Sequence, residues 1–527
     1  MRLRAGGARG ELNGSPRAHR HVRYRRRPRR PRPTWLAPLL PALRHALLRR
    51  AFDGGKPPLP RRVFVNRNLR LERIRYVGFD LDWTLAEYDR EAIDTAIFEL
   101  ALGFLVEQSG YPAAIRADAE FRPAFPRRGL IVDRQLGTVL KMSRHRYVGR
   151  AYLGRTPLTQ EERFRLYRLE PLDLGSDRFY RVDTLFELPE VNLFSELVEL
   201  GRRDPSRIAN RSPQALFDDV RHAVDSIHAN GSLKARITAD LPRYLPRDPE
   251  LALALVRLAL GGRRLFLITN SDFAYTERLC SYLLDGALPG LGSWRDLFDL
   301  VVTSAGKPSF FRRERPFVPL AADGSEGPEV AVPAWGGVYR GGSRDGLMAL
   351  LEVPGEQVLY VGDHIYSDVL TSKLRTTWRT ALIVRELEDE LEIAAEVAPE
   401  LRHLSALREE LSDLGHRMDD LRDVVQLAGE SGENGEMLGA ATARLAELEA
   451  QHAVLRQRAA ELQRRTSERH HRIWGPLFRQ GSNQSLFGAQ VKDFACLYTS
   501  RVGNLARYGT NHYFRVLEDP MTHDLAG

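Results

Sequence analysis

The sequence predicts an α/β protein with a parallel sheet, a large α+β insertion and a C-terminal helical hairpin. Three short apolar runs, 75–80, 264–271 and 357–363, end in polar residues, and each is followed by helix-like sequence. Strands that are apolar on both faces and alternate with helices are typical of parallel sheets. About 185 residues separate the first run from the second, and a heptad pattern begins beyond residue 385. The long interval predicts the insertion, and the heptads predict the hairpin.

The composition is that of an ordinary globular chain. Of the 527 residues, 43% are hydrophobic and 28% are charged, and no run of about 18 apolar residues offers a membrane span. We therefore expect a cytoplasmic protein without a membrane partner. The two cysteines, Cys280 and Cys496, lie far apart in apolar surroundings. They are expected to be buried free thiols, not a disulfide or a zinc site.

Residues 1–60 form an arginine-rich tail that we expect to be disordered. Residues 1–34 contain twelve arginines and one acidic residue, Glu11, for a local charge of +11. Because the whole chain carries +9, the remainder carries −2. Such a segment cannot bury enough apolar surface to fold. Its role stays open between an extension without function, a non-specific contact with nucleic acid or another polyanion, and an organelle presequence.

The predicted catalytic core comprises 61–95 and 250–385, and the interval 96–249 is predicted to be a cap domain that lies over the sheet edge. Within this cap, 129–133 reads as a strand and 215–229 as a helix, which indicates a mixed α+β unit. A second, shorter insertion follows within the core. Residues 312–342 contain a turn signal and an apolar run, and they are expected to form a hairpin or flap.

Residues 386–470 are predicted to form an antiparallel helical hairpin. Two apolar series keep a 3-4 spacing, and the Gly-rich stretch 429–435 separates them. The sequence leaves open whether the hairpin packs on the body or mediates oligomers, and we expect a homo-oligomer. The last segment, 471–527, is rich in aromatic residues and is expected to fold back on the core.

Two carboxylates stand at the end of the first predicted strand. Asp80 is positioned to attack phosphorus, because a carboxylate nucleophile divides one difficult displacement into two easier ones. Asp82 would protonate the leaving alcohol and then activate water. The alternative interpretation is a strand that ends in a solvated turn.

Polar residues at two further strand ends suit a phosphate group. Thr269, Asn270 and Ser271 offer hydroxyl and amide groups to phosphate oxygens, although they also resemble an ordinary helix N-cap. Lys307 follows a strand-like segment and would neutralise charge on the transferred phosphoryl group, unless it is a surface lysine.

Asp363, at the end of the third run, adds a hard oxygen ligand of the kind that Mg²⁺ prefers. Asp368, one helical turn later, would orient the neighbouring ligands or support the helix start. The carboxyl ends of parallel strands meet at one edge of a sheet, so these residues are expected to converge. Together they predict a Mg²⁺-dependent phosphohydrolase of phosphate monoesters.

The order nucleophile, hydroxyl, lysine and acid resembles that of the haloacid dehalogenase (HAD) superfamily. More specifically, the chain resembles the cytosolic purine 5′-nucleotidase family, which acts on IMP and GMP. The resemblance covers about residues 63–515 and is carried by segments 79–86, 128–133, 184–190, 217–221, 231–234, 269–272, 307–311, 362–368 and 482–490.

This resemblance implies a Rossmann-like HAD core with a cap, and a purine nucleoside monophosphate as substrate. It implies Mg²⁺ bound by Asp80, the backbone carbonyl of Asp82 and Asp363. In the cap, Tyr152 resembles a residue that stacks on the base, and Asp219 resembles one that hydrogen-bonds to the purine. Two alternatives stay open: a HAD phosphatase for another small phosphate ester, and a non-enzymatic scaffold or nucleic-acid-binding protein that uses the tail and hairpin.

Overall fold

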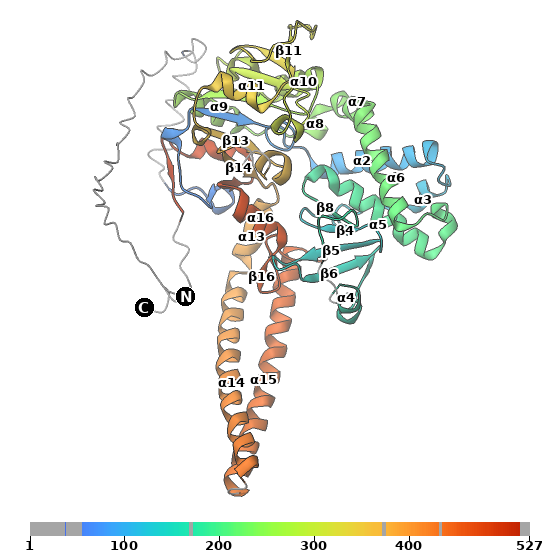
Figure 1. The fold of residues 1–527 in the computed structure, drawn as a ribbon, viewed down its shortest axis with the longest axis vertical. Coiled ribbons are helices and arrows are strands. Elements are labelled where there is room, and N and C mark those ends of the chain that lie inside the picture. The colour runs from blue at the N-terminus through green and yellow to red at the C-terminus, as the bar shows by residue number, and fades with distance from the viewer. Residues whose placement is uncertain (1–36, 38–54, 168–171, 371–375, 432–434, 517–527) are drawn as a thin grey trace, which may run out of the picture.

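The computed structural model describes residues 37, 55–167, 172–370, 376–431 and 435–516 (Figure 1). Most of the predicted tail, 1–60, lies outside the described residues, and so does part of the predicted turn at 429–435. Cys280 and Cys496 are both buried and free, as expected. In the described part of the chain, no helix combines the length and the apolar character needed to cross a membrane.

The core is a nine-stranded sheet in which all internal pairings are parallel. Only the two edge strands pair antiparallel, β1 with β17 and β11 with β12. The predicted parallel α/β sheet is therefore confirmed. Its strands, in spatial order, are β1 (Phe64–Val65), β17 (Leu497–Thr499), β14 (Arg379–Ile383), β13 (Val358–Gly362), β3 (Tyr76–Phe79), β9 (Arg264–Ile268), β10 (Leu300–Thr303), β12 (Val338–Gly341) and β11 (Phe317–Leu320).

The three predicted strands, β3, β9 and β13, are neighbours, with β3 in the middle. Their side chains are buried on both faces, which explains the continuous apolar runs. Gly78 is required within β3, because a Cβ atom there would lie 2.2 Å from the ring of Phe266 and 2.8 Å from that of Tyr360. Helices α9 (Leu251–Leu260), α10 (Phe273–Leu284) and α11 (Arg344–Leu351) surround the sheet (Figure 1).

The cap is a separate five-stranded antiparallel sheet with helices, so the inserted α+β domain is confirmed. Its strands, in spatial order, are β7 (Thr156–Pro157), β6 (Val148–Leu153), β5 (Thr138–Met142), β4 (Ile131–Asp133) and β8 (Phe179–Arg181). Its principal helices are α2 (Arg90–Gln108), α5 (Leu188–Arg203), α6 (Pro213–Ala229) and α7 (Ser232–Ala239). Figure 1 shows α6 and α7 running from the cap toward the core.

The segment predicted as a hairpin or flap, 312–342, forms a hairpin at the sheet edge. β11 pairs antiparallel with β12, and β12 continues the parallel sheet beside β10. A turn over Ala321–Ser325 follows β11. The segment therefore widens the catalytic sheet instead of standing free of it.

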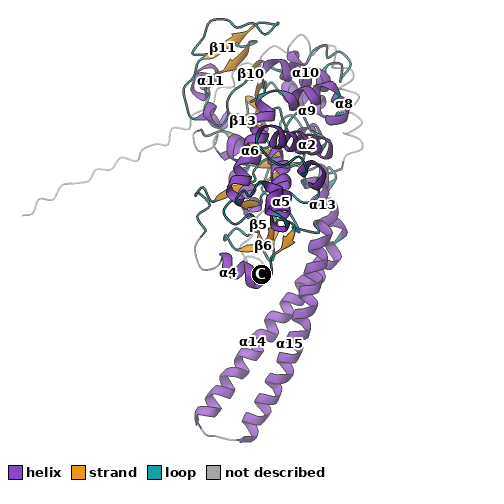
Figure 2. Cartoon of the chain, turned by 90° about the vertical axis from the view of Figure 1, so that its right-hand side faces the viewer, coloured by secondary structure: helices purple, strands orange, loops and turns teal. Residues whose placement is uncertain are grey.

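The predicted helical hairpin is confirmed: α14 (Ala398–Ser431) and α15 (Gly435–His470) pack side by side and project far from the body (Figures 1 and 2). Their seam buries Leu404, Leu414 and Leu448. One boundary differs from the prediction of 386–470. Residues at its start form a separate short helix, α13 (Leu387–Glu396), because Leu387 and Glu390 are buried against the body.

The C-terminal segment contributes a strand to the core sheet. Helix α16 (Leu486–Phe494) leads into β17, which lies between β14 and β1. Further on, β18 (Tyr513–Phe514) pairs with β2 (Leu69–Arg70) near the start of the described chain. In both places, β17 beside β1 and β18 beside β2, strands separated by more than 400 positions pair with each other.

Candidate active site

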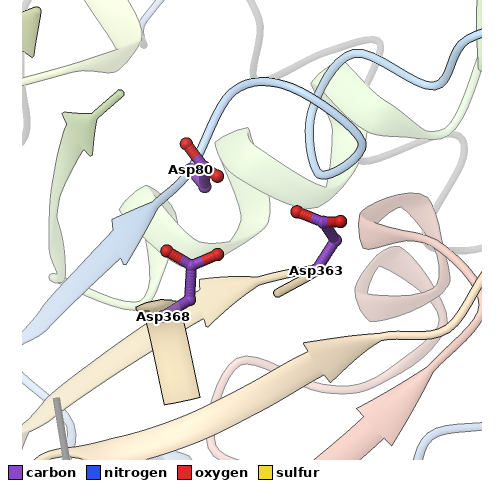
Figure 3. A group of neighbouring side chains, drawn as sticks. All are labelled: Asp80, Asp363 and Asp368. Atoms are coloured by element: carbon purple, nitrogen blue, oxygen red, sulfur yellow. The ribbon is translucent and has the colours of Figure 1, made fainter. Parts of the chain in front are cut away.

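Three buried carboxylates meet at the carboxyl end of the central strands (Figure 3). Asp80 directly follows β3, and Asp363 directly follows β13. Asp368 lies in the short helix η9 (Ile365–Leu370). One oxygen of each carboxylate lies within 4.8 Å of an oxygen of the others. The convergence expected from the parallel sheet is therefore observed for the two strand-end acids.

Lys307 links two of these carboxylates. Its Nζ atom lies 2.8 Å from Asp80 Oδ1 and 2.8 Å from Asp368 Oδ1, and it donates to Tyr360 Oη at 3.2 Å. Burial alone would lower the pKa of this ammonium, but the adjacent Asp368 and Asp80 carboxylates raise the pKa well above its usual value. Lys307 therefore stays charged, and the alternative of a surface lysine is wrong because the side chain is buried.

The buried charges do not balance, because three carboxylates face one lysine. Burial raises the pKa of Asp80 to about 7, against the opposing effect of Lys307. Burial, together with Asp368 and Asp80, also raises the pKa of Asp363 well above its ordinary range. Carboxylate oxygens held this closely are the ligands that a divalent cation such as Mg²⁺ prefers. The donor set therefore fits the metal that the sequence predicts.

Asp82 is held separately from these three acids. Tyr88 Oη donates to its Oδ1 atom at 2.6 Å, and Ser271 Oγ donates to its Oδ2 atom at 2.7 Å. Trp83, the next residue, has a left-handed backbone with φ of 57°. This turn brings the chain back on itself after β3, so that Asp80 and Asp82 belong to one site with different neighbours. Tyr88 Oη also lies 2.9 Å from Tyr275 Oη.

The three predicted phosphate-binding residues follow β9 but differ in their contacts. Asn270 uses its side-chain amide to fix the lysine loop: Oδ1 accepts from Lys307 N at 2.6 Å, and Nδ2 donates to Lys307 O at 3.1 Å. Thr269 is fully buried, and its Oγ1 accepts from Ser271 N at 3.0 Å. Asn270 and Ser271 line the cavity at the site, and Thr269 does not. Their contacts to phosphate stay a prediction.

A cavity of about 460 Å³ opens above the acids, between core and cap. The core contributes Asp80, Asp82, Lys307 and Asp363, and the cap contributes mainly Thr184, Phe186, Asp225, His228 and Lys234. Phe186 forms an aromatic wall with Tyr88 and His228, at ring-centroid distances of 6.0 Å and 5.7 Å. The polar chemistry therefore lies at the floor, and an aromatic surface covers part of the cap side.

Neither predicted base-contacting residue lines this cavity. The ring of Tyr152 packs against Trp474, at a centroid distance of 4.9 Å, on the cap sheet. Asp219 accepts a hydrogen bond from Tyr111 Oη at 2.8 Å. Asp219 precedes Asp225 on α6 by six residues. This spacing is about 600° of helical rotation, or about 240° beyond one full turn, so the two side chains point to different sides. The structure brings Asp225 to the cavity in place of Asp219.

Comparison with known proteins identifies the family. Residues 63–526 match the sequence profile of the 5′ nucleotidase family. The chain belongs to the 5′ nucleotidase family. A 5′-nucleotidase domain-containing protein of Dictyostelium discoideum is 32% identical over 459 residues, covering 85% of this chain and 72% of that protein. The human 5′-nucleotidase domain-containing protein 2 is 31% identical over 480 residues, covering 88% and 85%. The rat protein of the same name is 29% identical, covering 88% and 80%.

In this member of the 5′ nucleotidase family, Arg128 ties the cap to the catalytic sheet. The residue is 2% exposed, and its guanidinium pairs with Glu386 through two contacts, one of them 3.1 Å between Nε and Oε1. Nη1 also donates to the backbone carbonyl of Asp363 at 3.0 Å. The adjacent Arg127 pairs with Glu390 of α13. Arg128 therefore holds the backbone of Asp363, one of the predicted metal ligands.

Sequence reasoning missed Arg128, Tyr88, Tyr275 and His228. The segments 128–133 and 184–190 stood out by resemblance, which was a signal for Arg128 and for the cavity residues Thr184 and Phe186. Tyr88 and Tyr275 carried no motif: Tyr275 reaches the site through a contact with Tyr88, 187 residues away, and Tyr88 lies beyond the quoted segment 79–86.

Proposed function

We propose that this member of the 5′ nucleotidase family is a Mg²⁺-dependent phosphohydrolase that acts on purine nucleoside 5′-monophosphates through an aspartyl-phosphate intermediate. The observation that carries the proposal is the pairing of Asp80 with Lys307 beside Asp363, at the floor of a cavity large enough for a small ligand. Phosphoryl transfer needs a nucleophile, a fixed cation and an acid that can transfer protons, and Asp80, Lys307 and Asp82 are placed for these roles.

In the first step, a carboxylate oxygen of Asp80 forms a bond to phosphorus while the bond from phosphorus to the ester oxygen breaks. Lys307 lies 2.8 Å from the nucleophile and stabilises negative charge on the phosphoryl group. Asp82 gives a proton to the departing alcohol oxygen. In the second step, Asp82 takes a proton from water, the water oxygen attacks phosphorus, and phosphate leaves Asp80.

Tyr88 and Ser271 orient Asp82 for these two proton transfers. Both hydroxyl groups donate to its carboxylate, at 2.6 Å and 2.7 Å. Burial and the Asp82 charge raise the pKa of Tyr88 well above its usual value, so the phenol keeps its proton and stays a donor. Asp82 therefore has a fixed direction toward the cavity.

Asp80 and Asp363 would hold the Mg²⁺ ion, with Asp368 supporting them. Asp368 accepts from Lys307 Nζ at 2.8 Å and from His364 N at 3.3 Å, so its oxygens are already engaged. Bound Mg²⁺ supplies positive charge that offsets the phosphoryl oxygens and the clustered acids. The geometry of the residues supports this division between ligands and support.

Support for a nucleotide comes from the family and from the cap side of the cavity. Phe186 and His228 offer ring surfaces, and Asp225 and Lys234 add a hydrogen-bond acceptor and a donor to the lining. A purine base has apolar faces and a polar edge, which this combination suits. Another phosphate ester with a flat group would use the same chemistry at Asp80.

The test is release of inorganic phosphate from a panel of nucleotides and sugar phosphates, with and without Mg²⁺. We expect Mg²⁺-dependent release, fastest from IMP or GMP, and loss of release in Asp80→Asn. The exposed Asp296→Asn is a matched control, because it makes the same chemical change outside the cavity.

Each outcome separates the interpretations. Preference for a sugar phosphate would reject the purine substrate and keep the phosphatase. Release from no compound in the panel, or equal release by Asp80→Asn, would reject the catalytic role and favour the scaffold interpretation.

A further inference from the structure

The hairpin of α14 and α15 is the most protruding part of the described chain (Figures 1 and 2). Its helices have 34 and 36 residues, so each is about 50 Å long at 1.5 Å per residue. The seam between them is apolar and buried, but most residues on the outer surfaces are exposed to solvent. A two-helix unit of this length has two long sides, which differ here.

On one side, named the closed side, polar pairs connect the two helices. Arg408 Nη2 donates to Gln463 Oε1 at 3.1 Å, and Arg422 Nη2 donates to Glu449 Oε1 at 2.9 Å. The cap also reaches this side of α15, where Arg150 Nη2 donates to Ser467 Oγ at 2.8 Å. The closed side therefore already has partners within the chain.

The opposite side, named the open side, carries His403 of α14 and Val454, Arg458 and Arg465 of α15. A groove of about 530 Å³ runs between these residues. Arg465 is two residues from Ser467, or about 200° around the helix, so it points away from the cap. These four residues are all exposed to solvent.

Exposed apolar side chains gather on the open side. Val454, in the groove, is 50% exposed. Val424 is 41% exposed and stands three heptads after His403, and Met437 is 64% exposed and stands three heptads before Arg458. Residues separated by whole heptads share one side of a helix in a two-helix coil. The open side therefore combines a groove with unburied apolar surface.

Charge is distributed unevenly along the same hairpin. Near the body, residues 455–472 contain six arginines and two glutamates, for a charge of +4. In the middle of α14, residues 409–423 contain six acidic residues and two arginines, for a charge of −4. In the described part of the chain, Arg458 and Asp420 each lack an ion-pair partner. The basic body half of α15 and the acidic middle of α14 are thus electrostatically complementary.

We propose that the open side binds the open side of a second copy of this chain, with the two hairpins antiparallel and related by a two-fold axis. Arg458 lies 12 residues from the body end of α15, about 18 Å, and Asp420 lies 22 residues from the body end of α14, about 33 Å. These distances add up to the hairpin length, so full antiparallel overlap places Arg458 of each copy against Asp420 of the other.

The same arrangement explains Val454. It lies 16 residues from the body end, about 24 Å, which is close to the middle of the hairpin. A two-fold axis at that point brings the two Val454 side chains together, and a self-complementary patch is what a two-fold interface requires. Burial of Val454 and its groove supplies the apolar centre, and the Arg458–Asp420 contacts set the register.

The experiment is sedimentation equilibrium of the full chain over a range of concentrations. We expect a dimer for the wild type, which dissociates more readily at high salt because the register depends on charge. Arg458→Glu and Asp420→Arg should each weaken dimerisation by about tenfold or more, since each creates like-charge contacts. An equimolar mixture of the two variants should form a heterodimer, because each substitution restores an opposite charge to the other.

Arg456→Glu is the matched control. Arg456 is exposed on the same helix, but it lies about 200° around from Arg458, toward the closed side. We expect this variant to dimerise like the wild type, and circular dichroism should show unchanged helix content in all variants. A monomeric wild type, equal effects of Arg456→Glu and Arg458→Glu, or failure of the mixture to associate would each overturn the proposal.

Discussion

Replacing Arg128 by methionine tests how strongly the cap is tied to the catalytic sheet. Arg128 is buried, and its guanidinium is paired with Glu386 and with the carbonyl of Asp363. Removing one member of a buried ion pair leaves the other charge without compensation, which costs about 3–5 kcal/mol. The lost hydrogen bond to Asp363 adds about 1 kcal/mol. We therefore expect local opening of this junction to become easier by about 4–6 kcal/mol, limited by the stability of the whole unit.

The double variant Arg128→Met/Glu386→Leu separates charge from positioning. A buried ion pair replaced by apolar side chains is often close to neutral in stability, so most of the loss should be recovered. The contact to Asp363 is still absent in the double variant. We expect it to fold nearly as stably as the wild type but to bind Mg²⁺ more weakly, by about tenfold, as calorimetric titration would show.

The assay is hydrogen exchange of peptides that cover β13, β14 and α13. Arg340→Met is a matched control, because Arg340 also forms a two-contact pair, with Glu326, but on an exposed surface. It should leave exchange unchanged. Arg128 lowers the pKa of Glu386, so this pair stabilises the fold at neutral pH, and the contribution is lost as acid protonates the carboxylate. The difference between wild type and Arg128→Met should therefore shrink at low pH.

Three outcomes would refute this reasoning. Exchange that rises equally in every peptide of Arg128→Met would show global unfolding and not local opening of the junction. Unchanged exchange at the junction would show that the pair contributes no stability. Equal Mg²⁺ affinity of the double variant and the wild type would show that Arg128 does not position Asp363.

Three further predictions concern the acids and their partners. Lys307→Met should reduce phosphate release by about a hundredfold or more, because the nucleophile and phosphoryl group lose their fixed cation; retention of activity would exclude that role. Tyr88→Phe should slow release from nucleotides about tenfold but spare aryl phosphates, whose leaving groups need no acid; equal losses would contradict the link to Asp82. Stabilisation by Mg²⁺ should grow between about pH 6 and pH 8, because the pKa of Asp80 is raised to about 7: below that pH the metal must displace a proton from this carboxyl, and above it the carboxylate is already ionised. Thermal shifts that are equal at both pH values would refute this.

The sheet and the catalytic floor could be predicted because their signals are local. Asp80, Lys307 and Asp363 each follow an apolar strand, and the geometry of parallel sheets requires such strand ends to converge. The hairpin could be predicted for the same reason, since two heptad repeats show which residues form the seam and that the two helices pack against each other. In these cases a short stretch of sequence determines the contact.

The cap side of the cavity could not be predicted in the same way. Asp219 and Asp225 both lie on α6, and only the packing of that helix decides which one reaches the cavity. Asn270 has the chemistry to bind phosphate, yet the structure uses its amide on the backbone of Lys307, 37 residues away. Such assignments depend on contacts between distant segments, and the residue pattern within one segment does not reveal them.

The position of β17 has a consequence for how the chain folds during synthesis. This strand covers the edge of β14, and residues 497–499 are synthesised after every other strand of the nine-stranded sheet. Until then, the nascent catalytic sheet ends in an open strand edge, which is a template for aggregation. The long hairpin, made just before β17 from contacts close in sequence, can fold while the sheet still waits for its closing strand.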